Sequence, residues 1–64
     1  MSGCHRRSYE ALYAYTPSKP DEIELRRGEH YSVVERCHDG WFKGYALSTG
    51  RFGIFPGNYV RQTT

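Results

Sequence analysis

The side chains best suited to metal binding or catalysis in this 64-residue chain are two Cys-His pairs and one further histidine. The pairs, at positions 4–5 and 37–38, offer sulfur and imidazole ligands for zinc, but neither has the spacing of a zinc finger. His30 and His38 have no recognisable nucleophile or acid as a partner. The sequence therefore predicts no catalytic residue, no metal, no cofactor and no enzymatic activity.

Carboxylates are concentrated in one short stretch that contains Asp21, Glu22 and Glu24, although the net charge of the chain is +2. The internal lysines and arginines form no basic run of the kind that follows a nucleic-acid backbone. A small nucleic-acid-binding barrel, which also uses exposed aromatic rings, is the alternative to a protein-binding module. The acids argue against that alternative.

Aromatic residues make up 16% of the chain and include one tryptophan and six tyrosines. Trp41 is followed directly by Phe42, and successive strand side chains point to opposite faces of a sheet. We expect Phe42 to face the core and Trp41 to face solvent. Because so small a core cannot hold every ring, the sequence predicts an aromatic-lined recognition surface.

Short alternating segments broken by glycine and proline predict an all-β domain. The strands that we expect cover residues 8–15, 30–35, 41–47 and 52–55, with a short closing strand that reaches residue 62. Two prolines make residues 16–21 a loop, and residues 48–50 form a hairpin turn. Residues 56–58 end the fourth strand before a single 3-10 turn. Five short strands indicate a small antiparallel barrel or a two-sheet sandwich.

The same alternation predicts which side chains are buried. In the first segment one parity holds an alanine and three tyrosines, so strict alternation would give that strand one aromatic face. We expect Gly44 to lie where two strands approach closely. The core residues that we expect are Ala11, Ile23, Leu25, Tyr31, Val33, Phe42, Phe55 and Val60.

Four motifs, in this order, resemble those of Src homology 3 (SH3) domains. They are Ala11-Leu12-Tyr13-Ala14-Tyr15, Asp21-Glu22-Ile23-Glu24-Leu25, Gly40-Trp41 and Gly53-Ile54-Phe55-Pro56-Gly57-Asn58-Tyr59-Val60. The resemblance covers residues 8–62 and implies an SH3-type antiparallel barrel of five strands in two packed sheets, with one 3-10 turn near the C-terminus. Residues 1–7 are then expected to be a disordered tail or a cloning remnant, and residues 63–64 a second tail.

A narrower resemblance concerns residues 21–25, 35–44 and 55–60. These segments are similar to the third SH3 domain of the RING ubiquitin ligases known as plenty of SH3s. The narrower resemblance implies that the zinc-binding RING and the ligase activity lie elsewhere in a larger signalling scaffold. This domain would then contribute recognition only.

SH3 domains bind proline-rich segments in the polyproline II conformation. The resemblance therefore implies a non-catalytic adaptor module for PxxP peptides that carry a basic residue beside their prolines. Tyr13 and Tyr59 would form the first proline pocket. The residues expected to shape the second pocket are Tyr15, Trp41, Pro56 and Asn58. Tyrosine hydroxyls, the indole N–H and the Asn58 amide would donate hydrogen bonds to peptide carbonyls.

The resemblance also implies a third pocket, between Trp41 and the long loop, where a carboxylate pairs with a ligand arginine or lysine. Glu22 stands at that position. Asp21 and Glu24 are expected to reinforce it, together with Glu35 or Asp39.

Two departures from the family pattern alter these expectations. Ala14 replaces the usual acid between the two tyrosines, which leaves the conformation of the long loop less determined. Ubiquitin-binding members have phenylalanine where this chain has Tyr59, so we expect no ubiquitin binding. The expected partners are proline-rich segments of other proteins, with neither nucleic acid nor membrane bound, and the domain is expected to be monomeric. Two cysteines and no apolar signal segment favour a reducing, cytoplasmic location.

Overall fold

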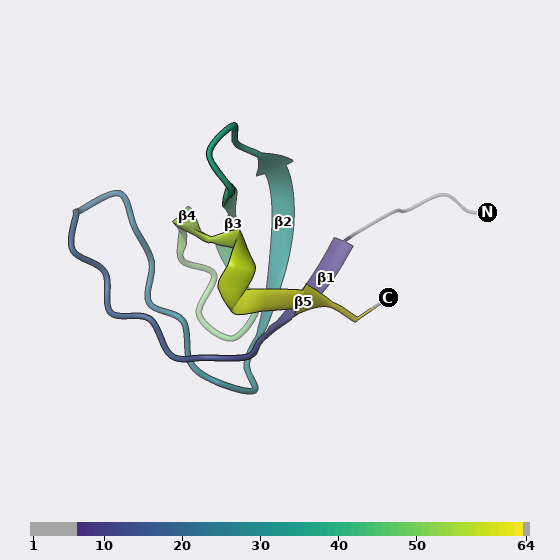
Figure 1. Ribbon diagram of the computed structural model, residues 1–64. Coiled ribbons are helices and arrows are strands. Elements are labelled where there is room, and N and C mark those ends of the chain that lie inside the picture. The colour runs from purple at the N-terminus through teal and green to yellow at the C-terminus, as the bar shows by residue number, and fades with distance from the viewer. Residues whose placement is uncertain (1–6, 64) are drawn as a thin grey trace.

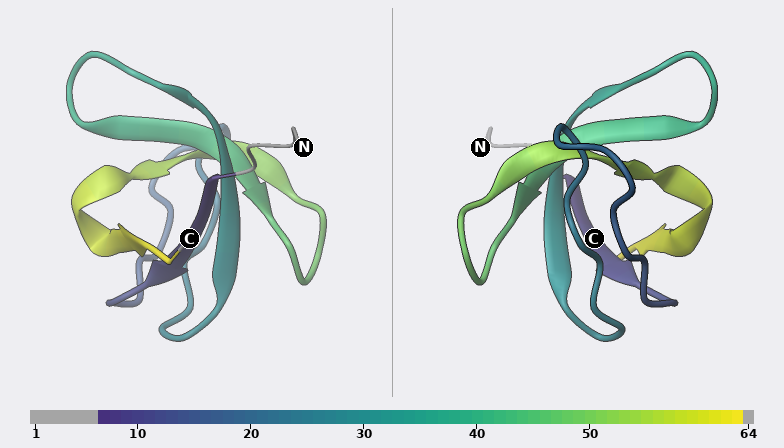
Figure 2. Two further views of the ribbon diagram at one scale, coloured as in Figure 1. Left: turned by 90° about the vertical axis from the view of Figure 1, so that its right-hand side faces the viewer. Right: turned by 90° about the vertical axis from the view of Figure 1, so that its left-hand side faces the viewer.

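The computed structural model describes residues 7–63, and its core element is one five-stranded antiparallel sheet (Figure 1). The elements are β1 (Arg7–Ala11), β2 (His30–Arg36), β3 (Trp41–Ala46), β4 (Phe52–Pro56), the 3-10 helix η1 (Gly57–Tyr59) and β5 (Val60–Gln62). The strand order is β4-β3-β2-β1-β5. The predicted all-β barrel with one 3-10 turn is confirmed, and its two layers belong to one hydrogen-bonded sheet that curls on itself (Figure 2).

The two ends of the described chain lie side by side, because β1 pairs with β5. β1 begins at Arg7, and Thr63 donates hydrogen bonds from its amide (2.9 Å) and its hydroxyl (3.1 Å) to the Ser8 carbonyl. Strand pairing thus begins at Arg7, and the bonds from Thr63 follow the last strand residue, Gln62. The remainder of the expected N-terminal tail, including Cys4, and residue 64 lie outside the described residues.

β1 is shorter than predicted, because the chain changes hydrogen-bonding partner after Ala11. The Leu12 amide donates to the Tyr59 carbonyl (2.7 Å) instead of continuing the ladder with β2. Tyr9, within β1, is buried at 4% exposure, whereas Tyr13, beyond the change of partner, is 59% exposed. The expectation of a strand over 8–15 with one aromatic face is wrong, since the two tyrosines occupy different environments.

Residues 12–29 form a long loop that runs back along the open edge of β4, as the right-hand view of Figure 2 shows. Tyr15 and Leu25 exchange two backbone hydrogen bonds of 3.0 Å across the loop. The return arm is attached to β4 by bonds from Ile23 N to Ile54 O (3.0 Å) and from Ile54 N to Asp21 O (2.9 Å). The loop therefore covers a sheet edge that would otherwise be open, and it carries its acidic residues to that edge.

The expected close approach at Gly44 is confirmed. A Cβ atom on Gly44 would collide with the backbone carbonyl of Ser32 on the neighbouring strand. A Cβ on Gly53 would lie 2.7 Å from the Asp21 carbonyl of the docked loop. Any larger residue at either position would separate backbones that hold the barrel together.

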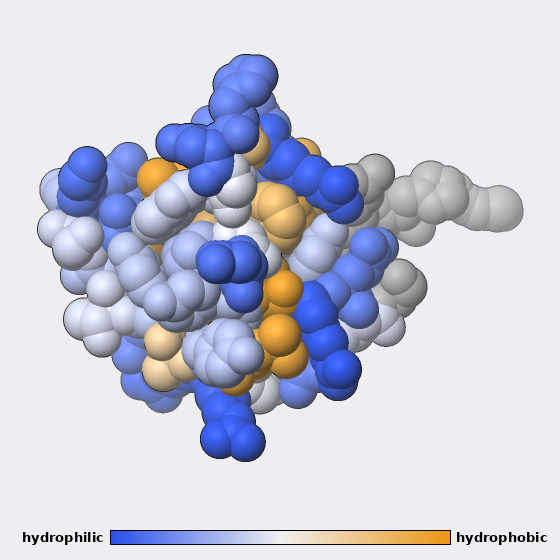
Figure 3. Space-filling view, viewed as in Figure 1, coloured by the Kyte–Doolittle hydropathy of each residue, from blue (hydrophilic) through white to orange (hydrophobic). Residues whose placement is uncertain are grey.

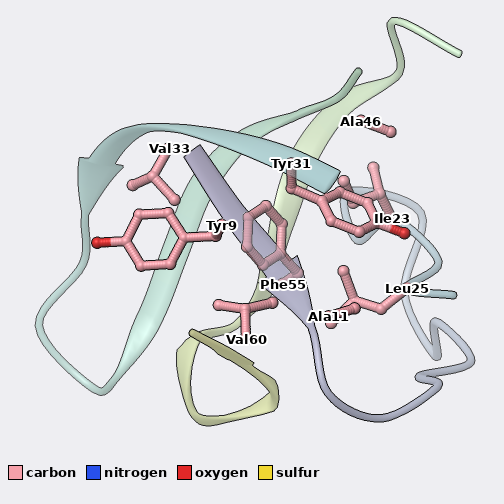
Figure 4. Packing of buried hydrophobic residues seen from close by; sticks show 9 residues of the cluster. All are labelled: Tyr9, Ala11, Ile23, Leu25, Tyr31, Val33, Ala46, Phe55 and Val60. Carbon is pink, nitrogen blue, oxygen red and sulfur yellow. The ribbon is translucent and has the colours of Figure 1, made fainter. Parts of the chain in front are cut away.

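The core lies inside the curled sheet (Figure 4) and includes every predicted core residue except Phe42. Two core members were not predicted, Tyr9 and Ala46. Phe42 is half-buried at the edge of the core, where its ring packs edge-on against Tyr9 (centroids 5.4 Å apart) and Phe55 (6.3 Å). The Arg36 guanidinium lies 5.7 Å from the centre of the Phe42 ring. Phe42 does face inward, but it is not fully enclosed.

Both buried tyrosines have hydrogen-bonded hydroxyls, which is what allows their polar ends to enter the core. The Tyr9 hydroxyl accepts a bond from Arg36 (3.0 Å). The Tyr31 hydroxyl accepts from the Arg26 amide (2.8 Å) and donates to the Glu24 carbonyl (3.3 Å). Burial is the main reason that the pKa of Tyr31 is raised above its usual value. Across residues 7–63, no helix is long and apolar enough to cross a membrane.

Candidate functional site

Four aromatic rings from three separate segments form a continuous row on the surface. Tyr13 and Tyr15 come from the long loop, Trp41 from the start of β3 and Tyr59 from η1. Ring centroids lie 5.8 Å apart from Tyr13 to Tyr59, 5.6 Å from Tyr59 to Tyr15 and 5.9 Å from Tyr15 to Trp41. All three contacts are edge-to-face, the favourable geometry for aromatic quadrupoles. We call this set the aromatic row.

Single backbone hydrogen bonds hold the segments of the aromatic row together. The bond from Leu12 N to Tyr59 O (2.7 Å) joins the start of the long loop to η1. The bond from Gly57 N to Gly40 O (2.8 Å) joins η1 to the loop between β2 and β3. A Cβ on Gly57 would approach the Gly40 carbonyl to 2.7 Å, so glycine is required for this contact.

The predicted site residues differ in how much surface they offer a ligand. Tyr13 and Asn58 are exposed, and the other three rings of the row are half-buried. Pro56 is buried and pairs with Trp41 across β3 and β4. Its expected part in shaping the second proline pocket stays a prediction. On the face shown in Figure 3, apolar surface is confined to small areas between polar side chains.

Glu22 fixes the conformation of the long loop through one carboxylate oxygen. Its Oε1 accepts hydrogen bonds from the Tyr15 hydroxyl (2.8 Å), the Ser18 amide (2.8 Å) and the Ser18 hydroxyl (3.3 Å). The Ser18 amide bond is the main reason that the pKa of Glu22 lies below its usual value. Ala14 stands where the family usually has an acid, and the bonds to Glu22 hold the loop without it.

The same bonds change the expected role of Tyr15. A tyrosine has one O–H to donate, and Tyr15 donates it to Glu22. That bond is also the main reason that the pKa of Tyr15 is raised. The Tyr15 hydroxyl hydrogen is therefore engaged within the loop, and the ring is the part of this side chain that contributes to the aromatic row.

A hollow of about 320 Å³ lies at the Trp41 end of the aromatic row. Three of the predicted acids line it, Asp21 and Glu22 from the long loop and Asp39 from the loop between β2 and β3. Among residues 8–63, whose side chains the structure describes, none of these three carboxylates forms an ion pair. The hollow is therefore acidic and suited to a ligand cation. We call it the acidic hollow.

Glu24, the fourth predicted acid, lies apart from the acidic hollow. Its carboxylate is 3.9 Å from the Arg26 guanidinium. It lines a different and larger hollow of about 640 Å³, beside Tyr31 and Arg51 and away from the aromatic row. Alternation with the buried Ile23 and Leu25 turns both Glu22 and Glu24 outward, so the conformation of the loop, not alternation, separates the two acids.

Sequence reasoning missed three residues that line the acidic hollow: Lys19, Cys37 and Ile54. The outward position of Ile54 follows from alternation with the buried Phe55 and was available from the sequence. The positions of Lys19 and Cys37 depend on loop conformations that no periodicity describes.

Comparison with known proteins identifies the family. A model of the SH3 domain matches residues 10–57. The chain belongs to the SH3 domain family. A relative that is 56% identical over 54 residues is the Sorbin and SH3 domain-containing protein 1 homolog of Caenorhabditis elegans, and the match covers 84% of this chain. This SH3 domain spans only 5% of the length of that relative.

Solved SH3 domains have the same fold. The C-terminal SH3 domain of Myosin IB from Entamoeba histolytica, bound to an EhFP10(GEF) peptide, has a TM-score of 0.83 at 27% identity, covering 97% of this chain and all of that one. The yeast Pin3 SH3 domain has a TM-score of 0.82 at 35% identity, covering 89% and 98% of the two chains. The fold expected from the four motifs is thus confirmed.

Proposed function

We propose that this SH3 domain is a non-catalytic interaction module that binds proline-rich segments of other proteins. The observation that carries the proposal is the aromatic row, which ends at the acidic hollow. A polyproline II peptide already has its bound conformation and no internal hydrogen bonds, so an aromatic surface with polar ends suits it. The peptide-bound Myosin IB neighbour supports peptide binding as the use of this fold.

The acidic hollow adds a charge preference to the proposal. A basic residue beside the prolines would lie against Trp41 and meet carboxylates from two loops. Such a pair is exposed to solvent, so we expect it to influence which peptides are chosen more than the total affinity. Glu22, Asp21 and Asp39 are the proposed cation-binding residues, and Glu24 has no contact that supports this role.

The direct test is titration with a proline-rich peptide that carries one arginine and with a scrambled peptide of equal composition. Arginine placed at either end of the prolines covers both binding directions. We expect dissociation constants of roughly micromolar size, corresponding to about 8 kcal/mol of binding free energy. Equal affinity for the ordered and scrambled peptides would show that the domain does not recognise the polyproline II conformation.

Binding of single-stranded nucleic acid has less support. It needs basic side chains around exposed rings, whereas carboxylates surround the Trp41 end of the row. Titration with an oligonucleotide at two salt concentrations separates the classes, because nucleic-acid affinity falls steeply with salt.

The role of the parent protein is a separate proposal. The sorbin-type relative favours an adaptor containing SH3 domains. The narrower resemblance to the plenty-of-SH3s ligases has no support from the relatives described above, and the associated RING, zinc and ligase context remains a prediction. A cytoplasmic location also remains a prediction.

A further inference from the structure

A lysine shares the acidic hollow with the carboxylates that are proposed to bind the ligand's basic residue. Lys19 lines the hollow together with Asp21, Glu22, Asp39 and Trp41. Within the described residues, the Lys19 ammonium forms no ion pair with any of these acids. The site thus already contains one cation of its own.

The backbone around Lys19 is held in place by Glu22. The Glu22 amide donates to the Lys19 carbonyl (3.1 Å), and Glu22 Oε1 accepts from the adjacent Ser18 amide (2.8 Å). Pro17 and Pro20 further restrict the backbone on both sides. The backbone at the base of the Lys19 side chain is therefore held beside the hollow, and the side chain itself is exposed.

We propose that Lys19 is a specificity-determining residue of the peptide site, which reduces the preference for basic peptides and disfavours a second basic residue in the ligand. The inference rests on the proposed function. With Lys19 present, three carboxylates and one ammonium line the hollow; without it, only the three carboxylates remain charged there. One ligand arginine is attracted by this arrangement. A second arginine is repelled by the Lys19 ammonium, which is also attracted to the carboxylates that this arginine would need.

The experiment compares Lys19→Ala with the parent domain, using three proline-rich peptides that carry one arginine, two arginines, or alanine in place of both. We expect the variant to bind the one-arginine peptide about two- to fivefold more tightly, the range of exposed charge pairs, and to bind the alanine peptide unchanged. The gain should be larger for the two-arginine peptide and should shrink at high salt, because exposed charges are screened.

Two control variants separate the local charge from other causes. Lys19→Arg keeps the charge and should leave all three affinities at the parent values. Arg27→Ala removes one positive charge from an exposed residue that lines neither the acidic hollow nor the aromatic row, and it should change little. An equal gain with Arg27→Ala would mean that net charge alone is responsible, which overturns the inference.

The remaining outcomes distinguish failure of this inference from failure of the proposed peptide binding on which it rests. If the alanine peptide binds and Lys19→Ala changes no affinity, or changes all three equally, Lys19 does not select charge and only this inference fails. If no proline-rich peptide binds the parent domain, both the inference and the proposed function are wrong.

Discussion

The barrel core and the aromatic row are built on different kinds of contact. The core lies inside the curled sheet, with Ile23 and Leu25 contributed by the docked long loop, and its largest buried side chains, Tyr31, Phe55 and Leu25, have less than 2% exposure. The aromatic row is assembled from separate segments that single backbone bonds join at Leu12 and Gly57. Truncation in the core should therefore affect folding, whereas truncation in the row should affect binding and leave the fold intact.

The largest expected effect is in the core. Phe55→Ala should destabilise the domain by about 3–5 kcal/mol, since it removes a fully buried ring that packs against Tyr31 and Phe42. A small domain has only about 5–15 kcal/mol in total, so the variant is expected to be largely unfolded at physiological temperature. Phe42→Ala should cost less, because Phe42 is only half-buried. Urea denaturation of both variants tests this order, and a greater loss for Phe42→Ala would contradict the burial argument.

The second prediction concerns the aromatic row. Trp41→Ala should weaken proline-peptide binding by about 2 kcal/mol or more, the loss expected for a central aromatic contact, while the thermal transition stays close to that of the parent. Phe52→Ala is the matched control, because this ring is 60% exposed on β4 and outside the row. Loss of cooperative unfolding in Trp41→Ala would place the indole in the core and remove the contrast between the two regions.

The contrast also explains what the sequence could predict. Alternation placed Trp41 and Phe42 on opposite sides correctly, because β3 is a regular strand. It failed after Ala11, where the chain bonds to Tyr59 and leaves its strand, since that choice depends on a residue far along the sequence. The family motifs located the rings of the site, but ligand binding by those residues remains a prediction.

The acidic residues show most clearly what the sequence could not predict. Glu22 and Glu24 are two positions apart in one motif, yet only Glu22 lines the acidic hollow. Asp39 reaches the same hollow from another loop. The family resemblance predicts acids near Trp41, but loop conformation determines which of them share a hollow and which are already hydrogen-bonded.

The third prediction uses pH to test whether Glu22 stabilises the loop. Its pKa is lowered in the folded state, so its contribution to stability is present above the ordinary glutamate pKa and is lost as pH falls through the lowered value. Glu22→Gln should therefore be less stable than the parent at neutral pH, and the difference should shrink on acidification. The variant should also have a lower Tyr15 pKa, because the bond to Glu22 is what mainly raises it. Urea midpoints across the acidic range and a tyrosine titration by NMR test these expectations, and a pH-independent difference would contradict them.

The smallest expected effect distinguishes an acid that stabilises the loop from one that is available to a ligand. Asp39 lines the acidic hollow, is exposed, and forms no side-chain hydrogen bond or ion pair with the described side chains of residues 8–63. Asp39→Asn should leave stability unchanged and weaken a one-arginine peptide about two- to fivefold, with no change for the matched alanine peptide. Glu22→Lys should also weaken the arginine peptide more than the alanine peptide, but it should lower stability as well, because Oε1 accepts the bonds from Ser18 and Tyr15. Calorimetric titration of both peptides, paired with denaturation of each variant, separates the two roles. If Asp39→Asn weakens both peptides equally, Asp39 does not pair with the basic residue, and Asp21 and Glu22 are the acids left in the hollow to do so.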